Sequence, residues 1–310
     1  DRIKGMANDV RTVAALPDPV GEAIEARVLP NGLRLERRRV PLGVICTIYE
    51  SRPNVTSDIS SLCLKSGNAV VLRGGKESLR SNSILARIIR EAAQAGGVPG
   101  DAVQFIESTD RTLVYELLKL KNTIDLVIPR GGAGLVNMVY ENATIPVLAS
   151  GVGVCHMYVD PTADLKKATA IAYNAKVQRP TVCNALDCVL VHSSVAKKFL
   201  PMMARELSKA NVEMHCDKRA LDILSGFKAK KAVASDWGKE FLALVLAVKV
   251  VDSLDEAIEH IEKYGSGHSE AIITEDYSAA MSFTTEVDAA CVYVNASTRF
   301  TDGGQFGLGA

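Results

Sequence analysis

The sequence predicts an α/β protein of two domains, each built on a parallel β-sheet. Short, β-rich apolar runs alternate with longer segments of helical periodicity along most of the chain, which is the pattern of consecutive β-α-β units. A chain of 310 residues is long enough for two such domains, each with its own apolar core. One segment near the start departs from this pattern and predicts a projecting β-hairpin.

The first block of alternating elements covers residues 44–128. Val44–Tyr49 is an apolar, β-rich run, and Thr56-Ser57-Asp58 can cap a helix that ends near Lys65. Ala69–Arg73 is an apolar run typical of a strand buried on both faces. The remaining elements are expected at 78–95 (helix), 103–106 (strand), 110–120 (helix) and 124–128 (strand).

A second block begins near Gly151 and continues the alternation. We expect helices at 162–175, 195–210 and 254–264, and strands at 188–192, 271–274 and 291–294. We therefore place one domain at residues 1–150 and a second at 151–294. The last stretch, 295–310, is rich in Ser, Thr, Asp and Gly and is expected to be an exposed loop followed by a return segment.

The predicted hairpin lies at residues 25–40, where two alternating runs flank Asn31-Gly32. Asn-Gly strongly favours a two-residue hairpin turn. The basic cluster Arg37-Arg38-Arg39 by itself indicates only a solvated face.

Composition excludes several classes of partner. The chain carries 36 Lys+Arg and 36 Asp+Glu, so its formal charge of zero gives no indication of a nucleic-acid partner. No apolar run is long enough to span a bilayer, and the first residues lack a signal-peptide pattern. The seven cysteines are an odd number and form no Cys-x-x-Cys pair, so neither a zinc site nor a disulfide framework is favoured. This cysteine usage suits a reducing cytoplasm.

Cys183 is the strongest candidate for chemistry. It lies in the polar stretch 178–184 (QRPTVCN), between a helical run and an apolar strand-like run. A free cysteine is more often a small buried hydrophobe. The polar neighbours make a poor core lining, and donors around a thiol favour the reactive thiolate. Cys155, in the run GVGVCH, is the alternative nucleophile, whereas Cys188 sits inside an apolar strand and is interpreted as core.

Two turns between a predicted strand and a predicted helix could bind ligands. Asn54 follows Arg52-Pro53 and could aim its amide at a site, or could simply be a helix-entry residue. Arg130, Gly131 and Gly132 open a Gly-rich turn whose backbone N–H groups could approach a phosphate. A tight strand-to-helix turn explains this second motif equally well.

Long ordered segments carry a resemblance to a known family. They are VICTIYESRPNVT (44–56), IPRGGAG (128–134), GVGVCH (151–156), QRPTVCN (178–184) and VYVNASTRFTDGGQFGLGA (292–310). In these segments, and in order from about Pro41 to Ala310, the chain resembles the gamma-glutamyl phosphate reductases (glutamate-5-semialdehyde dehydrogenases) of the aldehyde dehydrogenase superfamily. Judged by this resemblance, an N-terminal helical portion and a C-terminal tail are expected to be missing.

The resemblance implies an aldehyde dehydrogenase-like fold and a specific reaction. The expected reaction is reduction of L-glutamyl 5-phosphate by NADPH to L-glutamate 5-semialdehyde in proline biosynthesis. Cys183 is then the nucleophile that forms a thioester, and Asn54 completes an oxyanion hole with the backbone N–H of the nucleophile. Domain 1–150 is expected to bind the dinucleotide, and domain 151–294 is expected to be catalytic.

The resemblance also assigns binding residues. Arg73 and Lys76 fall where relatives hold the adenosine ribose, and two cations there suit a 2′-phosphate. The Arg130-Gly131-Gly132 turn is expected beside the dinucleotide. Further assignments are Glu240 to the nicotinamide ribose, Arg299 to the substrate carboxylate, Asp302 to its ammonium group, and Asn295 to the same substrate loop, 295–310. Surface cations or acids are the alternative for Arg73, Lys76 and Glu240.

Partners and rival functions follow from the same comparison. The hairpin is expected to pair with another subunit in a homo-dimer or tetramer, and a glutamate 5-kinase that supplies the labile acyl phosphate is a candidate partner. Val245, Ala247 and Asp187 depart from the reductase pattern, and Ala149 stands about where hydrolytic relatives place a general base. The alternatives are another superfamily enzyme that oxidises an aldehyde, and a catalytically silent relative that binds nucleotide or a partner kinase.

Overall fold

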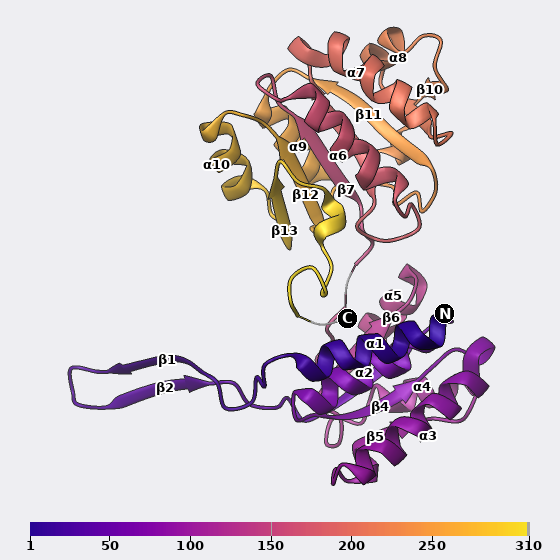
Figure 1. The fold of residues 1–310 in the computed structure, drawn as a ribbon, viewed down its shortest axis with the longest axis vertical. Helices are drawn as coiled ribbons and strands as arrows, with labels where there is room; N and C mark the ends of the chain where they lie inside the picture. Colours follow the sequence, from indigo (N-terminus) through magenta and orange to yellow (C-terminus); the bar gives the residue numbers. More distant parts are fainter. Residues whose placement is uncertain (150, 309–310) are drawn as a thin grey trace. The chain divides into compact units, whose positions relative to one another are not determined.

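The computed structural model describes residues 1–149 and 151–308, which divide into two compact units (Figure 1). Unit 1 comprises residues 1–149 and 303–308, and unit 2 comprises residues 151–302. The predicted boundary residue Ser150 and the last two residues of the expected return segment, Gly309 and Ala310, lie outside the described residues. Among the described helices, none combines the length and the apolarity that crossing a bilayer demands.

Unit 1 is built on a four-stranded sheet in which all pairings are parallel, with strand order β5-β4-β3-β6. Its strands are β3 (Val44–Tyr49), β4 (Ala69–Arg73), β5 (Val103–Phe105) and β6 (Leu126–Arg130). Successive strand residues point to opposite faces. Ile45 and Tyr49 therefore pack with helices α2 (Pro53–Lys65) and α3 (Leu79–Ala95), and Cys46 and Ile48 pack with α4 (Thr112–Leu117) and α5 (Ala133–Asn142).

The elements predicted for unit 1 are present, with shifted ends. Helix α2 begins three residues before the predicted start because Pro53 occupies its first turn, where a missing N–H costs nothing. A short 3-10 turn, Lys76–Ser78, precedes α3, which begins one residue after the predicted start. Helix α1 (Arg2–Ala15) was not predicted. It packs on α2, and Val13 is its buried residue.

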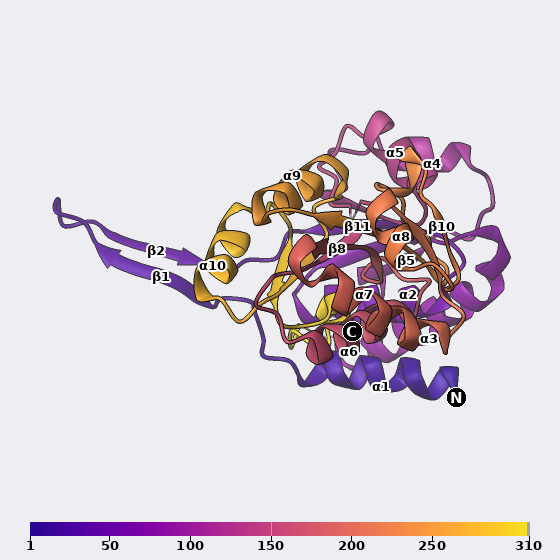
Figure 2. The same cartoon turned by 90° about the horizontal axis from the view of Figure 1, so that it is seen from above.

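The hairpin consists of β1 (Ala23–Val28) and β2 (Arg34–Arg38) in antiparallel register and projects from unit 1 (Figures 1 and 2). Its turn is longer than the predicted Asn31-Gly32 pair. Leu29 donates to the Leu33 carbonyl at 2.8 Å, which leaves Pro30, Asn31 and Gly32 in the loop. Pro30 has no N–H to continue the ladder, and Gly32 takes φ = +86°. Every residue of both strands is exposed.

Unit 2 contains a seven-stranded sheet of parallel pairings, with strand order β10-β9-β11-β8-β7-β12-β13. The strands are β7 (Cys155–Val159), β8 (Leu186–His192), β9 (Glu213–Cys216), β10 (Ala229–Lys231), β11 (Val245–Val251), β12 (Ser269–Ile273) and β13 (Cys291–Val294). One face packs with α6 (Leu165–Val177), α7 (Ser193–Ser208) and α8 (Lys218–Ile223), and the other packs with α9 (Leu254–Tyr264) and α10 (Tyr277–Glu286).

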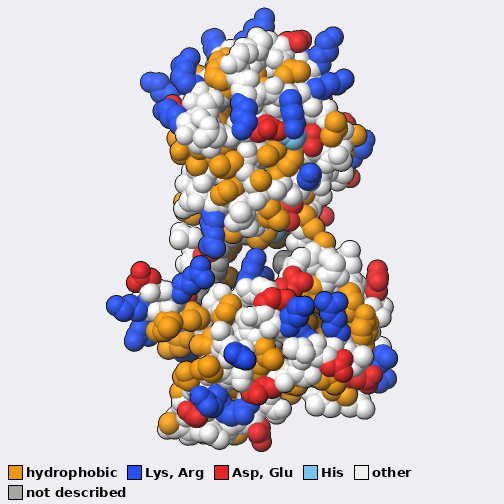
Figure 3. Space-filling model, turned by 90° about the vertical axis from the view of Figure 1, so that its right-hand side faces the viewer, with side chains coloured by type: hydrophobic (Ala, Val, Ile, Leu, Met, Phe, Trp, Pro, Cys, Tyr) orange, Lys and Arg blue, Asp and Glu red, His pale blue; other side chains and the backbone are white. Residues whose placement is uncertain are grey.

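Both units thus have helices on the two faces of a parallel sheet, which confirms the predicted α/β class. Alternation in β8 divides its side chains between two cores: Val189 and Val191 face α6 and α7, whereas Cys188 and Leu190 face α9 and α10. Basic and acidic side chains intermix over the face drawn in Figure 3, as the balanced composition predicts.

Candidate active site around Cys183

Cys183 lies in the loop between α6 and β8 and is exposed. Five of the other cysteines are buried and Cys291 is partly buried. The alternative nucleophile, Cys155, begins β7 and is fully buried, and its burial raises the pKa of this thiol well above the usual value. Its Sγ instead donates to the Cys183 carbonyl at 3.2 Å. The structure therefore presents Cys183, and not Cys155, to a reagent or substrate.

Gly153 allows the segment before β7 to pass close to the Cys183 loop. A Cβ at this position would lie 1.9 Å from the Cys183 carbonyl oxygen, so another residue would displace the loop. The backbone N–H of Gly153 donates to Glu240 Oε1 at 3.3 Å. Glu240, predicted from the family resemblance as a ribose ligand, thus lies beside the segment that supports the thiol, and burial raises the pKa of its carboxyl group.

A buried ion pair connects the Cys183 segment to the Glu240 loop. Lys176, in the last turn of α6, places Nζ 3.2 Å from Asp187 Oδ1 in β8. The same Oδ1 accepts a hydrogen bond from the backbone N–H of Phe241 at 3.2 Å. Burial raises the pKa of Asp187 to about 6 and lowers the pKa of Lys176. Lys176 was not predicted, because a lysine within a helical run resembles a solvated cation.

Asn184, the residue after Cys183, connects the Cys183 loop to residues 297–301 through hydrogen bonds. Asn184 is buried, and its amide donates to the Thr301 carbonyl at 2.8 Å, while Thr298 Oγ1 donates to the Asn184 carbonyl at 2.8 Å. Arg299 donates from Nε to Gln178 Oε1 at 3.2 Å and from its terminal nitrogen to Asn184 Oδ1. The structure therefore brings the predicted substrate residue Arg299 to the predicted nucleophile loop.

The other two predicted substrate residues differ in their surroundings. Asn295 has φ = +55°. Its side chain pairs with the backbone of Thr274, accepting at 3.1 Å and donating at 2.8 Å, so its amide joins two strand ends. Asp302 is exposed, and its backbone N–H donates to the Phe300 carbonyl at 2.8 Å.

In unit 1 the predicted dinucleotide residues gather at the carboxyl ends of the parallel strands, the edge where open α/β sheets bind ligands. Arg73 ends β4 and is 8% exposed. Its guanidinium donates to the carbonyls of Gly74, Thr109 and Asp110 at 2.8, 3.4 and 3.3 Å. Lys76 follows and is exposed. Arg73 therefore ties β4 to the loop after β5, whereas Lys76 offers its ammonium to solvent.

The turn after β6 contains a carboxylate that was not predicted. Gly132 donates its N–H to Glu50 Oε2 at 2.9 Å, at the N-terminus of α5. A Cβ on Gly131 would lie 2.6 Å from the same oxygen, so Gly131 makes room for this carboxylate. Arg130 ends β6 and is exposed. Glu50 therefore occupies the position at the helix N-terminus that a phosphate could otherwise take.

Asn54 is the second residue of α2 and is exposed. Its Nδ2 donates to Asp58 Oδ2 at 2.9 Å, one helical turn later. Because an amide nitrogen carries two hydrogens, this bond orients the Asn54 side chain and leaves a second N–H for another acceptor. Asp58 was predicted only as part of a capping segment, and burial raises the pKa of its carboxyl group.

Comparisons with known proteins identify relatives of this chain. The family model described as "Aldehyde dehydrogenase family" matches residues 3–223 and 222–307. A gamma-glutamyl phosphate reductase of Dehalococcoides mccartyi is 62% identical over 312 residues, covering 100% of this chain and 74% of the relative. The corresponding protein of Aquifex aeolicus is 56% identical over 315 residues, covering 100% of this chain and 72% of the relative.

Solved structures agree with the fold. The crystal structure of gamma-glutamyl phosphate reductase from Thermotoga maritima is 53% identical, covers 99% of this chain and 73% of that chain, and superposes with a TM-score of 0.95. An acetylating aldehyde dehydrogenase from Geobacillus thermoglucosidasius, 22% identical over 97% of this chain and 74% of its own, shares the fold with a TM-score of 0.74.

An α/β protein with an exposed cysteine on the loop before a central strand, matched by the family model along nearly its whole length, belongs to the aldehyde dehydrogenase family. Within that family it belongs to the gamma-glutamyl phosphate reductases.

Proposed function

We propose that this chain reduces L-glutamyl 5-phosphate to L-glutamate 5-semialdehyde with NADPH and releases phosphate, as a step of proline biosynthesis in the cytoplasm. The observation that carries the proposal is the exposed thiol of Cys183, on a polar loop, in a chain 62% identical to a gamma-glutamyl phosphate reductase. Residues 1–150 are proposed as the dinucleotide-binding part, residues 151–294 as the catalytic part, and residues 295–310 as the substrate loop.

The thiolate of Cys183 attacks the acyl carbon of the substrate. A carbon–sulfur bond forms, the carbon–oxygen bond to phosphate breaks, and phosphate leaves with the bonding electrons, so that a thioester remains. The nicotinamide, when bound, supplies a hydride, that is, two electrons and one hydrogen for the thioester carbon. The carbon–sulfur bond then breaks, which releases the aldehyde and regenerates the thiolate of Cys183.

The negative oxygen that develops during attack requires hydrogen-bond donors. Asn54 is proposed as one donor, because Asp58 holds its amide and leaves one N–H available. The backbone N–H of Cys183 is proposed as the other. Removing one such donor typically costs about 10²–10³ in rate.

Arg299 is proposed to bind the substrate carboxylate. Its guanidinium is held by Gln178 and Asn184, both in the Cys183 loop, and it has donors beyond those two bonds. Asp302, on the same segment, is proposed for the ammonium group. Asn295 is proposed to support this segment through its bonds to Thr274.

The residues present fit a phosphorylated dinucleotide. The exposed cations Lys76 and Arg130 follow or end strands β4 and β6 of one sheet, at its carboxyl edge. Lys76 is proposed to bind the 2′-phosphate, and Arg73 is proposed to hold the turn that precedes Lys76. The Arg130-Gly131-Gly132 turn is proposed to lie along the dinucleotide. Glu240 is proposed to accept hydrogen bonds from the nicotinamide ribose.

The exposed hairpin is proposed to pair with a second copy of the chain in a dimer or tetramer. It exposes Ile24, Val28, Leu33 and Leu35 by 51, 68, 60 and 43%. Replacing Leu33 and Leu35 with Asp should give a smaller particle in light scattering, and an unchanged mass would contradict the pairing. A glutamate 5-kinase is proposed as a functional partner, since its product is the substrate.

The proposed activity is tested in the oxidative direction. Purified protein is given glutamate 5-semialdehyde and NADP⁺, with and without phosphate, and formation of NADPH is followed by absorbance. We expect reduction only with phosphate, with arsenate as an effective substitute. Brisk phosphate-independent reduction would instead favour a general aldehyde dehydrogenase, and no activity would favour a silent relative.

A further inference from the structure

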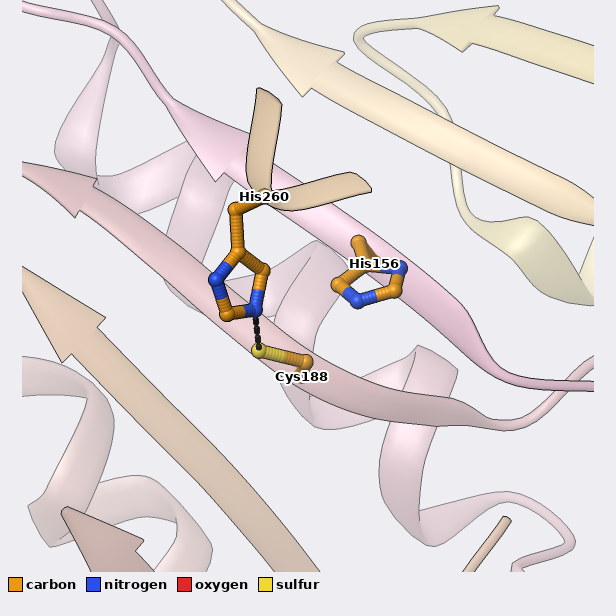
Figure 4. A group of neighbouring side chains, drawn as sticks. All are labelled: His156, Cys188 and His260. Carbon is orange, nitrogen blue, oxygen red and sulfur yellow. Dashed lines mark hydrogen bonds between the residues drawn. The ribbon is translucent and has the colours of Figure 1, made fainter. Parts of the chain in front are cut away.

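Three side chains with metal-binding atoms meet in the core of unit 2, on the face covered by α9 and α10. They are His156 from β7, Cys188 from β8 and His260 from α9 (Figure 4). One ligand atom of each lies within 4.8 Å of the other two, and all three residues are buried. We propose that this cluster binds one thiophilic transition-metal ion, zinc(II) or copper(I), separately from the Cys183 site.

His156 is held as a metal ligand would be. Its Nδ1 lies 3.0 Å from Glu270 Oε2, and its backbone N–H donates to the same oxygen at 2.7 Å. Because a carboxylate accepts hydrogen bonds, Nδ1 carries the proton and Nε2 presents a lone pair. A carboxylate behind a histidine in this way fixes the tautomer and orients the ring toward a metal.

The Nε2 atom of His156 is buried and has no hydrogen-bond partner among the described residues. Leaving a buried polar atom unsatisfied costs about 1–3 kcal/mol, so such an atom needs an explanation. Figure 4 shows the three side chains converging from their separate elements. An ion bound between them would supply the missing partner.

The separations suit a single ion. Cys188 Sγ lies 3.8 Å from His260 Nε2. Zinc takes sulfur at about 2.3 Å and nitrogen at about 2.0 Å in a tetrahedral arrangement, which places neighbouring ligand atoms roughly 3.5 Å apart. Where two ligand atoms are as far apart as 4.8 Å, one side chain must move inward by about 1.3 Å.

The ligand set also indicates the class of ion. Thiolate and imidazole ligands select zinc or copper(I) over magnesium and calcium, which prefer oxygen. With zinc(II), the Cys188 thiolate and the Glu270 carboxylate would balance the two positive charges. Three protein ligands leave a fourth position of zinc open, whereas copper accepts a trigonal set of two histidines and one cysteine.

Lys249 must adjust when the ion binds. Its Nζ lies 3.4 Å from His260 Nδ1 and 3.2 Å from Glu256 Oε1. Coordination through Nε2 leaves the proton of the neutral ring on Nδ1, so Nδ1 no longer accepts from the ammonium. Lys249 then retains Glu256 as its partner, and this exchange offsets part of the binding free energy.

The test uses the full chain, because a buried site is loaded as the protein folds. Cells are grown with added zinc or added copper, the protein is purified in a chelator, and bound metal is measured by mass spectrometry. We expect about one ion per chain, as zinc in the first culture or copper in the second. Growth with cobalt should give a thiolate-to-cobalt charge-transfer band.

Matched variants locate the ion. Cys188→Ser and His156→Gln should each reduce bound metal at least about tenfold, whereas Cys216→Ser, which alters a buried cysteine on the opposite face of the sheet, should retain it. Wild-type protein with less than about 0.1 ion per chain under all three conditions would overturn the proposal. Equal metal content in wild type and Cys188→Ser would also overturn it. The metal content of the wild-type protein tests the proposal even if a variant fails to fold.

Discussion

Lys176 and Asp187 form an ion pair inside unit 2, with Nζ 3.2 Å from Oδ1 and both side chains almost fully buried. Asp187 also accepts the backbone N–H of Phe241, the residue after Glu240. The helix that leads into the Cys183 loop is thereby connected to the loop that carries Glu240. Because a buried ion pair often contributes little net stability, we infer that this pair mainly fixes the position of the Glu240 loop relative to the Cys183 loop.

Replacing Lys176 with Met should leave the Asp187 carboxylate buried without its cation. Removing one partner of a buried pair typically costs about 3–5 kcal/mol, so the urea midpoint should fall sharply. The double variant Lys176→Met, Asp187→Leu should recover much of that stability, yet kcat/KM should stay low because Phe241 has lost its acceptor. A double variant with wild-type kcat/KM would show that the pair does not position the Glu240 loop.

The pH dependence of stability should reflect Asp187. Burial raises its pKa from 3.8 to about 6, so the folded state holds the proton more tightly than the unfolded state does. The contribution of this group to stability is therefore largest below pH 3.8 and is lost as the pH rises to about 6. The unfolding free energy of wild type, measured relative to that of Asp187→Asn, should therefore fall across this window, because the side chain of the variant stays uncharged at every pH. A constant difference would contradict the raised pKa.

Cys183→Ala should reduce turnover by at least about 10³-fold while NADPH binding, measured by fluorescence, changes little. The exposed thiol should react with iodoacetamide before the other six. Cys291→Ser serves as the control, since Cys291 is the partly buried thiol. Retained activity in Cys183→Ala, or first labelling at another position, would refute the assignment.

Lys76→Ala should weaken the binding of NADPH much more than the binding of NADH. Loss of one charge-assisted bond of about 1.4 kcal/mol corresponds to about a tenfold increase in KM for NADPH. Arg73→Met should instead lower the melting temperature, because Arg73 binds three backbone carbonyls. Equal losses for both nucleotides in Lys76→Ala would place the ammonium away from the 2′-phosphate.

Glu240→Gln separates ribose binding from general-base catalysis. No carboxylate occurs between Asn142 and Tyr158, but the fold brings Glu240 to Gly153. If Glu240 binds the ribose, the variant should raise KM for NADPH about tenfold and leave the slow hydrolysis of the Cys183 thioester unchanged. If the variant instead slows hydrolysis of the thioester and leaves the KM for NADPH unchanged, Glu240 acts as a general base toward water. The amount of free glutamate released per turnover, compared between wild type and Glu240→Gln, distinguishes these two roles.

The sequence predicted the α/β class, most strand and helix positions and the hairpin, because these depend on local periodicity and turn chemistry. The prediction of a two-residue turn was wrong, because Pro30 has no N–H to donate to the hairpin ladder. The prediction relied on the Asn31-Gly32 pair and did not take this backbone constraint into account. Helix α1 was missed, and its burial comes mainly from packing on α2.

The candidate nucleophile could also be proposed from sequence, since Cys183 has polar neighbours that make a poor lining for an apolar core. Its surroundings could not. Gly153, Lys176 and Glu240 reach the Cys183 region from separate elements, and periodicity carries no information about which strand lies beside which. Glu50 at Gly132 and Asp58 at Asn54 likewise required side-chain geometry.

The sequence by itself therefore determined the class of fold and the family, and it singled out Cys183 as the candidate nucleophile, since each depends on patterns of residues close together in the chain. Tertiary structure alone decided that Arg73 binds backbone carbonyls while Lys76 stays exposed, that Cys155 is buried, and that His156, Cys188 and His260 meet. The physical reason is that burial and the pairing of distant polar groups are set by the order of strands in the sheet, which brings together residues such as His156 and Glu270 that are 114 positions apart in the chain.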